Sequence, residues 1–239
     1  MRKTFTAIFL LIILFGCEGL LQPSEKKVTK RIEISKMPIR IDIKSMFDIV
    51  LHQNDSIYAV VTCNSSYVND VDIHAKDDTL YLEHSVSMRW LHGYDIIKLD
   101  LYLPYLPIIH VKAPVSIKTK EKFYTKMLNI SDWEYYSNCD IDVQTTYVVI
   151  QSSGSSYSSF HITGSADSAF VYSRGSSVID LSELQVNACT IHHKSIADAR
   201  LNVSTLLRAE ILSSGKVYYK GNPTVVMLSG DRNMVVKEE

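Results

Sequence analysis

The sequence predicts an all-β fold: a right-handed parallel β-helix, or β-solenoid, with coils of about 20 residues in two continuous parts. One observation behind this prediction is a set of five similar segments spaced 20, 21, 20 and 20 residues apart, at 128–130, 148–150, 169–171, 189–191 and 209–211. The other is an alternating apolar pair after each segment: Ile141/Val143, Phe160/Ile162, Ile179/Leu181, Leu201/Val203 and Val217/Tyr219. A single coil of this length cannot enclose a core, so the coils are expected to stack and bury one continuous interior.

Each of the five segments has the alternation of a strand with one buried face. The first and third residues are apolar or small, whereas the middle residue varies from Asn129 to Glu210. Four residues later a corner is expected, with Gly154, Gly175 and Gly215 in three of the copies. Residues 109–111 supply an earlier copy, which gives about six coils. The alternative is an antiparallel sandwich with evenly spaced turns, because two strands and two turns also span about 20 residues.

Residues 1–16 are predicted to be a signal peptide. Arg2 and Lys3 give a positive start, an apolar run follows, and Gly16 directly precedes Cys17. This arrangement resembles a bacterial lipoprotein signal, which implies that Cys17 is the site of lipid attachment and ties the mature chain to a membrane. The alternative is an ordinary secretory leader in which Cys17 has no role. Residues 17–31 are polar and are expected to form a flexible tether.

The charge balance argues against nucleic acid as a partner. The chain holds 25 Lys and Arg against 26 Asp and Glu, and removal of Arg2 and Lys3 leaves 23 basic residues. The mature chain therefore has no basic excess with which to neutralise phosphates.

Three cysteines remain besides Cys17, namely Cys63, Cys139 and Cys189. An odd number cannot form a complete set of disulfides. The coil spacing places Cys139 and Cys189 inside the stack, three coils and roughly 14 Å apart, which is too far for a bridge. These two cysteines are therefore expected to be free, buried and unreactive.

Residues 32–104 are predicted to form the first β part. Its strands are expected over 39–43, 47–51, 58–62, 71–73, 80–82 and 97–103, with turns at 53–55, 64–66 and 76–78. Residues 67–70 are the one place where helical character is expected. Residues 105–236 form the second part, which contains the repeat.

Several motifs resemble one known family. They are the segments 41–43, 47–51, 77–82 and 99–104 with Leu106, and a closing segment over 215–223. Together they are similar to the auto-transporter adhesin, head GIN domain family, and the resemblance covers residues 32–236. It implies a two-part β-solenoid, commonly a lipoprotein of Bacteroidetes-type envelopes, with an adhesive role.

No motif for catalysis, a cofactor or a metal is found in the sequence. Lyases built on β-helices need stacked carboxylates on neighbouring coils to hold calcium, but the partners of Asp140 and Asp142 one coil later are His161 and Thr163. The only adjacent histidines, at 192 and 193, face opposite ways on a strand and cannot readily chelate one metal, so both are expected at the surface. The protein is therefore predicted not to be an enzyme, with no catalytic residue, no cofactor and no metal.

The outward positions of successive coils predict one candidate binding patch. One column holds Ser131, Gln151, Tyr172, His192 and Leu212, and the next holds Trp133, Ser153, Arg174, Lys194 and Ser214. Tyr172, Arg174, His192 and Lys194 would then lie side by side and combine aromatic faces with two cations, which suits an acidic sugar or a partner loop. The alternative is an ordinary mixed solenoid face.

The predicted function is that of a non-enzymatic, membrane-anchored lipoprotein of the cell envelope. Its β-solenoid surface would serve adhesion or binding to an extracellular glycan or protein, and its anchor is expected in the outer membrane, facing the periplasm or the surface. The alternative is a surface protein that binds or processes carbohydrate on a β-helix. A third hypothesis is an assembly unit that stacks end to end through strand edges, unless residues 234–239 cap them. The sequence leaves the oligomeric state open.

Overall fold

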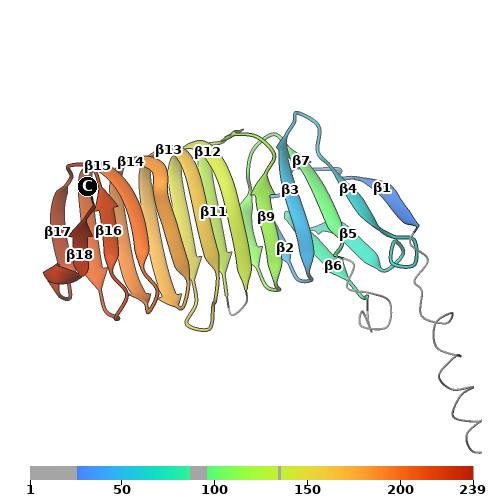
Figure 1. Cartoon of the computed structure of the whole chain (residues 1–239). Helices are drawn as coiled ribbons and strands as arrows, with labels where there is room; N and C mark the ends of the chain where they lie inside the picture. Colours follow the sequence, from blue (N-terminus) through green and yellow to red (C-terminus); the bar gives the residue numbers. More distant parts are fainter. Residues whose placement is uncertain (1–25, 87–95, 134–135, 239) are drawn as a thin grey trace, which may run out of the picture.

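A computed structural model of the chain describes residues 26–86, 96–133 and 136–238. Within these residues, eighteen strands form one sheet that winds into a β-solenoid of about six turns with coils of roughly 20 residues (Figure 1). The strands are β1 (Lys27–Glu33), β2 (Arg40–Ile43), β3 (Phe47–Gln53), β4 (Tyr58–Asn64), β5 (Val71–Lys76), β6 (Thr79–His84), β7 (Lys98–Leu103), β8 (Ile108–Val111), β9 (Val115–Thr119), β10 (Phe123–Tyr124), β11 (Met127–Asp132), β12 (Ser137–Ser152), β13 (Ser159–Gly175), β14 (Val178–Ser195), β15 (Ala199–Ile211), β16 (Val217–Lys220), β17 (Thr224–Ser229) and β18 (Val235–Lys237). The predicted all-β solenoid is confirmed. The predicted signal peptide and Cys17 lie outside the described residues.

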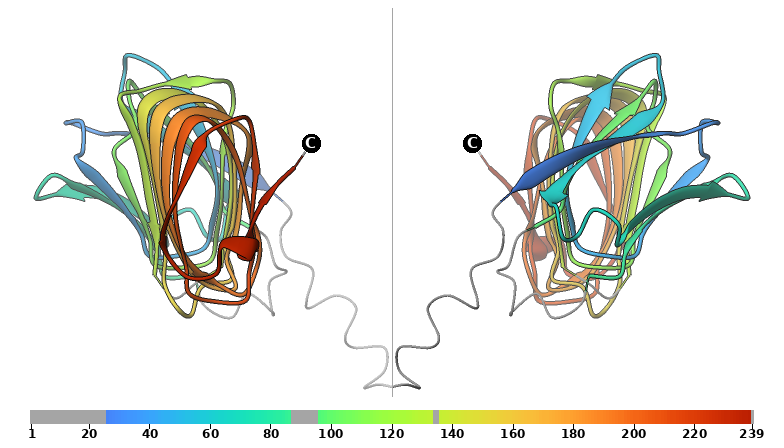
Figure 2. Two further views of the ribbon diagram at one scale, coloured as in Figure 1. Left: turned by 90° about the vertical axis from the view of Figure 1, so that its left-hand side faces the viewer. Right: turned by 90° about the vertical axis from the view of Figure 1, so that its right-hand side faces the viewer.

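Each full coil of the C-terminal half is one long strand that bends in its middle. Residues 137–140 of β12 pair in parallel with β9, whereas residues 147–152 of the same strand pair with β11. β13, β14 and β15 repeat this path and so build two facing walls. Wall 1 is the stack that contains β9 and residues 137–140, and wall 2 is the stack that contains β11 and residues 147–152. Seen end-on in Figure 2, the coils appear as flattened loops. β16 and β18 extend wall 1, and β17 extends wall 2.

The interior between the walls is filled by side chains from both. Ile141 from wall 1 and Val148 and Ile150 from wall 2 are fully buried, as the alternation of a strand with one inner face requires. The same buried cluster continues from Ile34 to Val235, so the two predicted parts share one core.

Most of the predicted repeat register is confirmed by strand pairing. Leu128, Val148, Ala169 and Cys189 form one column through successive strands. The fifth predicted member is wrong, because Cys189 pairs with Leu207 and Ala209 pairs with Ile191. The cause is two register shifts between β14 and β15. Each shift leaves extra residues without a partner on the neighbouring strand, so the spacing between paired residues departs from an even period.

Three other register predictions are also off by two residues. The early copy at 109–111 pairs Ile109 with Ile130 and not with Leu128. In the second set of pairs, Phe160 pairs with Cys139 and not with Ile141, and Ile179 pairs with Ala199 and not with Leu201.

The N-terminal strands stack out of sequence order. In wall 2, β2 lies between β6 and β8, and in wall 1, β3 lies between β7 and β9, all in parallel. Figure 1 shows this as blue β3 inserted between the green strands β7 and β9. Beyond these coils the pairing becomes antiparallel, with β4 on β7, β1 on β4 and β5 on β6.

The predicted tether extends too far into the folded part. Residues 27–31 belong to β1, which pairs along its full length with β4. Its apolar side chains are few, and Lys27, Lys30 and Arg31 mark it as a charged edge strand, the kind that resists pairing with another chain. The helical character expected over 67–70 is likewise wrong, because this stretch forms turns closed by the Tyr67 N–H to Asn64 O and Asp70 N–H to Tyr67 O bonds. The described residues do contain one short 3-10 helix, η2 (Arg232–Met234).

The cysteine prediction is confirmed for the described residues. Cys139 and Cys189 are free, and both are buried, as is Cys63. Burial raises the pKa of the Cys139 and Cys189 thiols to about 12, and a thiol that stays protonated is a poor nucleophile.

Candidate functional site

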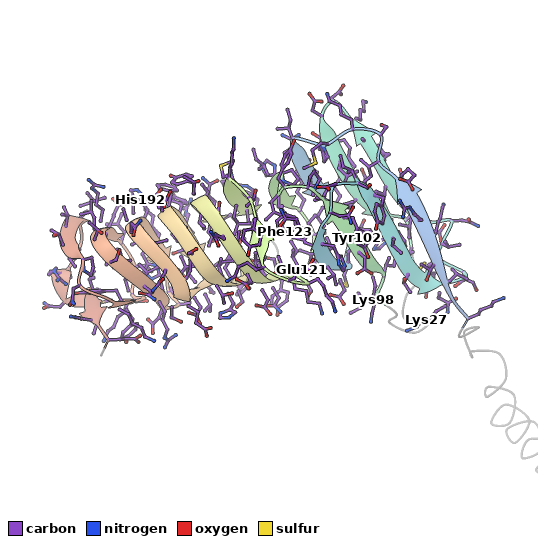
Figure 3. The ribbon with its side chains drawn as sticks, turned by 90° about the horizontal axis from the view of Figure 1, so that it is seen from above. Lys27, Lys98, Tyr102, Glu121, Phe123 and His192 are labelled. Carbon is purple, nitrogen blue, oxygen red and sulfur yellow. The ribbon has the colours of Figure 1, made fainter. Side chains whose placement is uncertain are left out.

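The four residues predicted as a binding patch lie together on the outer face of wall 2. Strand pairing places Tyr172 beside His192 and Arg174 beside Lys194, on β13 and β14. The ring centroids of Tyr172 and His192 are 6.3 Å apart, and the Lys194 ammonium lies 5.6 Å from the centroid of the Tyr172 ring. In Figure 3, His192 lies along one long side of the molecule, and Lys98 and Glu121 lie along the other.

Two further residues complete this surface, called the outer patch below together with the predicted four. Glu210 follows His192 in the column, where the sequence predicted Leu212, and its carboxylate accepts a 2.8 Å hydrogen bond from His192 Nδ1. Phe170 packs against the other side of His192 with ring centroids 5.5 Å apart. The register shift that displaced Ala209 also hid Glu210, because both lie on β15.

Glu210 changes the electrostatics of the outer patch. Its carboxylate lies 3.9 Å from the Lys194 ammonium, and both side chains are partly exposed, so this ion pair is worth at most about 1 kcal/mol. Arg174 is exposed and has no ion pair within the described part of the chain. The outer patch therefore offers one cation without an ion pair among the described residues, one shared cation, and the rings of Phe170, Tyr172 and His192.

The adjacent histidines occupy different environments. His192 faces outward, as predicted, but His193 is fully buried, so the expectation that both are surface residues is wrong for His193. Ser173 Oγ lies 2.7 Å from His193 Nδ1, and burial lowers the pKa of His193. A fully enclosed Ser–His pair cannot reach a substrate, and this contact joins the neighbouring strands β13 and β14 inside the stack.

The outer face of wall 1 carries charges of alternating sign. As predicted, Asp140 pairs with His161 and Asp142 with Thr163, and the next residue in the Asp140 column is Asp180. Burial of Asp180 opposes ionisation, but hydrogen bonds from the Ser182 hydroxyl and N–H outweigh it and lower the Asp180 pKa. Asp180 is thus held ionised, which does not suit a general acid.

An aromatic column that the sequence did not reveal covers the N-terminal end of wall 1. The Tyr58 and Tyr102 rings stack at 4.2 Å, and His52 stacks on the other face of Tyr102 at 4.3 Å. The Arg31 guanidinium covers the free face of Tyr58 at 3.6 Å, and Asp100 Oδ1 lies 2.6 Å from His52 Nε2. Because these ring faces are occupied by one another, the column stabilises the antiparallel end and leaves little aromatic face for a sugar.

The described residues contain no group of three or more His, Cys, Asp or Glu able to hold a metal ion. Across those same residues, no helix has both the length and the apolar character that a membrane crossing requires.

The chain matches one family model over residues 38–223, and the description of that family is "Putative auto-transporter adhesin, head GIN domain". No curated protein matches it in sequence.

Solved structures share its fold. A putative adhesin from Bacteroides fragilis is similar with a TM-score of 0.76 and 23% identity, over 90% of this chain and 97% of that one. A putative adhesin from Parabacteroides distasonis has a TM-score of 0.63 and 16% identity, over 92% of this chain and 99% of that one. A putative lipid binding protein from the same species has a TM-score of 0.60 and 16% identity, over 91% and 99%. At these identities the likeness shows the fold.

Proposed function

The chain belongs to the auto-transporter adhesin, head GIN domain family, and we propose that it is a non-enzymatic lipoprotein of the bacterial envelope that binds a surface glycan or protein. Such a family suggests a protein of the cell surface or envelope. The finer parts of the proposal are the lipid anchor at Cys17 and the use of the outer patch for binding.

The single observation that carries the binding role is that the outer patch combines aromatic rings with a cation on regular, paired strands. Tyr172 and His192 are partly exposed and lie near the exposed Arg174, and all three stand on hydrogen-bonded strands of a packed wall. Side chains held on regular strands need little reordering on binding, which favours affinity. Aromatic faces with a nearby guanidinium suit an acidic sugar or an acidic loop of a partner protein.

The alternative of a polysaccharide-processing enzyme has less support. Such an enzyme needs carboxylates that converge on one groove, whereas the carboxylates of the wall 1 column alternate with Lys118, His161 and Arg200. Carbohydrate binding without chemistry stays within the proposal.

A glycan array tests the binding role. The soluble form should begin no later than residue 26, because β1 starts at Lys27 and would be lost from a shorter chain. Binding to acidic glycans or to host-cell surfaces is expected to fall about tenfold or more in an Arg174→Ser, Tyr172→Ser double variant, corresponding to the loss of about 1.4 kcal/mol. A matched change on wall 1, Arg200→Ser with Tyr218→Ser, should leave binding unaltered. Equal binding by all three proteins would contradict the outer patch as the binding surface.

The anchor is tested separately. Cells that express the full chain and receive an alkyne-tagged fatty acid should label it, and the Cys17→Ser variant should lose both the label and its partition into the membrane fraction. Labelling that persists in Cys17→Ser would contradict this part of the proposal.

A further inference from the structure

An apolar groove of about 740 Å³ runs along the corner where wall 1 passes into wall 2. Three chain segments from neighbouring coils form it: residues 38–39 before β2, residues 105–108 leading into β8, and residues 124–127 from the end of β10 to the start of β11. The groove lies outside the outer patch, and its volume is in the range of sites for small ligands.

The groove is lined by apolar side chains that the fold leaves open to solvent. Ile39, Tyr105 and Tyr124 are 63%, 50% and 57% exposed, and Ile108 and Met127 are partly exposed beside them. An exposed apolar surface that is both continuous and concave marks a place where something else is buried.

The walls of the groove are fixed by hydrogen bonds. The Gln53 side chain donates to the carbonyl oxygens of Pro104 (3.0 Å) and Tyr124 (2.7 Å), and it accepts from the Tyr124 N–H at 2.8 Å. It thereby clamps two of the three segments together. The third is joined by the bond from the Ile108 N–H to Ile39 O at 3.0 Å.

The same bonds argue against a peptide as the occupant. A peptide that adds to a strand edge needs free backbone groups on the protein. Here the N–H groups of Ile39, Ile108 and Thr125 already donate to Asp78 O, Ile39 O and Gln144 O. A ligand without backbone groups, such as an alkyl chain, suits this surface better.

The two ends of the groove differ in charge. Among the described residues that line it, Lys126 alone carries a charge, and Lys126 has no ion pair within the described ranges. At the other end, Ile39 adjoins Asp78, which is itself paired with Lys36. An unpaired cation at one end of an apolar groove complements an anionic head on an apolar tail.

We propose that this groove binds a single long-chain fatty acid, with its carboxylate at Lys126 and its alkyl chain directed past Tyr124 toward Ile39. The inference does not depend on the adhesive role. It assigns the chain a ligand of a different chemical class, at a different place on the molecule.

Binding is measured by titrating the full chain with 11-(dansylamino)undecanoate and competing the probe with palmitate or with uncharged hexadecanol. Saturable binding of one probe per chain is expected, with palmitate the stronger competitor. Ile39→Asp is expected to weaken palmitate binding about tenfold or more, because the new charge lies in the apolar groove. Ile196→Asp changes an equally exposed isoleucine elsewhere on the solenoid and should have no effect.

Lys126→Gln tests the head group. It is expected to remove the preference for palmitate over hexadecanol while leaving hexadecanol binding unchanged, whereas Lys220→Gln, a control on β16, should preserve the preference. If circular dichroism shows that Ile39→Asp does not fold, Tyr124→Ser provides the second test of the apolar wall, with the same expected loss of affinity.

Three results would overturn the proposal. They are the absence of saturable binding to the native chain, equal palmitate affinity in Ile39→Asp and Ile196→Asp, and binding to phosphatidylglycerol vesicles without binding to monomeric palmitate. The Arg174→Ser, Tyr172→Ser variant separates the two functions, since it should bind palmitate normally even if its adhesion is lost.

Discussion

Replacing Gly164 by Ala tests whether the bend between the two walls has the geometry described above. Gly164 has φ +104 and lies under the preceding coil, where an added Cβ would come within 2.0 Å of the Val143 carbonyl oxygen. Real Cβ contacts are almost never closer than 3.0 Å, so the two coils must separate by about 1 Å or the bend must change. Ala in this backbone conformation costs about 1–3 kcal/mol, and the loss of one or two ladder hydrogen bonds adds about 0.5–1.5 kcal/mol each. The total expected loss of unfolding free energy is about 1.5–6 kcal/mol.

The matched control is Gly154→Ala. Gly154 lies in a corner turn with no atom within 4 Å of an added Cβ and without positive φ, so Ala there should be neutral or stabilising by up to about 1 kcal/mol. Guanidinium denaturation followed by circular dichroism gives both values, provided that the m-values agree. The reasoning about the bend is refuted if the two variants differ by less than about 1 kcal/mol.

Three further predictions concern the core and its buried groups. Phe160→Ala should cost about 3–5 kcal/mol in the same assay, because its ring is fully buried; a cost below about 1 kcal/mol would show that the walls collapse around the gap. Burial lowers the pKa of His193 below 6.5, so the unfolded chain binds a proton first and stability present above pH 6.5 is lost as the pH falls, by at most about 1.4 kcal/mol per pH unit for this group. His193→Gln should flatten this pH dependence in part, since burial also lowers the pKa of His110, and an unchanged slope would contradict the assignment. Cys139 and Cys189, with pKa values of about 12, should react with Ellman's reagent only after unfolding, whereas rapid reaction of the native protein would contradict their burial.

The sequence predicted the coil path where strands run without irregularity. From Leu128 to Cys189 the spacing alone placed the inward column and, with it, Tyr172 beside His192. The prediction failed where β14 meets β15, because a bulge changes the register without changing the apolar alternation. Glu210 was missed for this reason.

Pairing between distant strands could not be predicted in the same way. Apart from β1, the strands of the N-terminal part were located to within a few residues, but an apolar strand has the same pattern whichever neighbour it pairs with. The insertion of β2 and β3 between later coils therefore has no signal in periodicity. The fatty-acid groove was missed for a related reason, since it is built by three connections that become neighbours only through this pairing.

The insertion of β2 and β3 between later strands means that the two ends of the molecule must fold by contacts of different sequence separation. Ile41 must find Ile109, whereas Val148 needs only to find Ala169. That roughly threefold longer loop adds about 1 kcal/mol of closure entropy per first contact, and topologies with distant contacts fold slowly. The C-terminal coils can therefore form early by adding one neighbour at a time, while residues 40–53 must wait for partners on both sides. During synthesis from the N-terminus, residues 40–53 would therefore lack one of their two neighbouring strands until about residue 119 had been made.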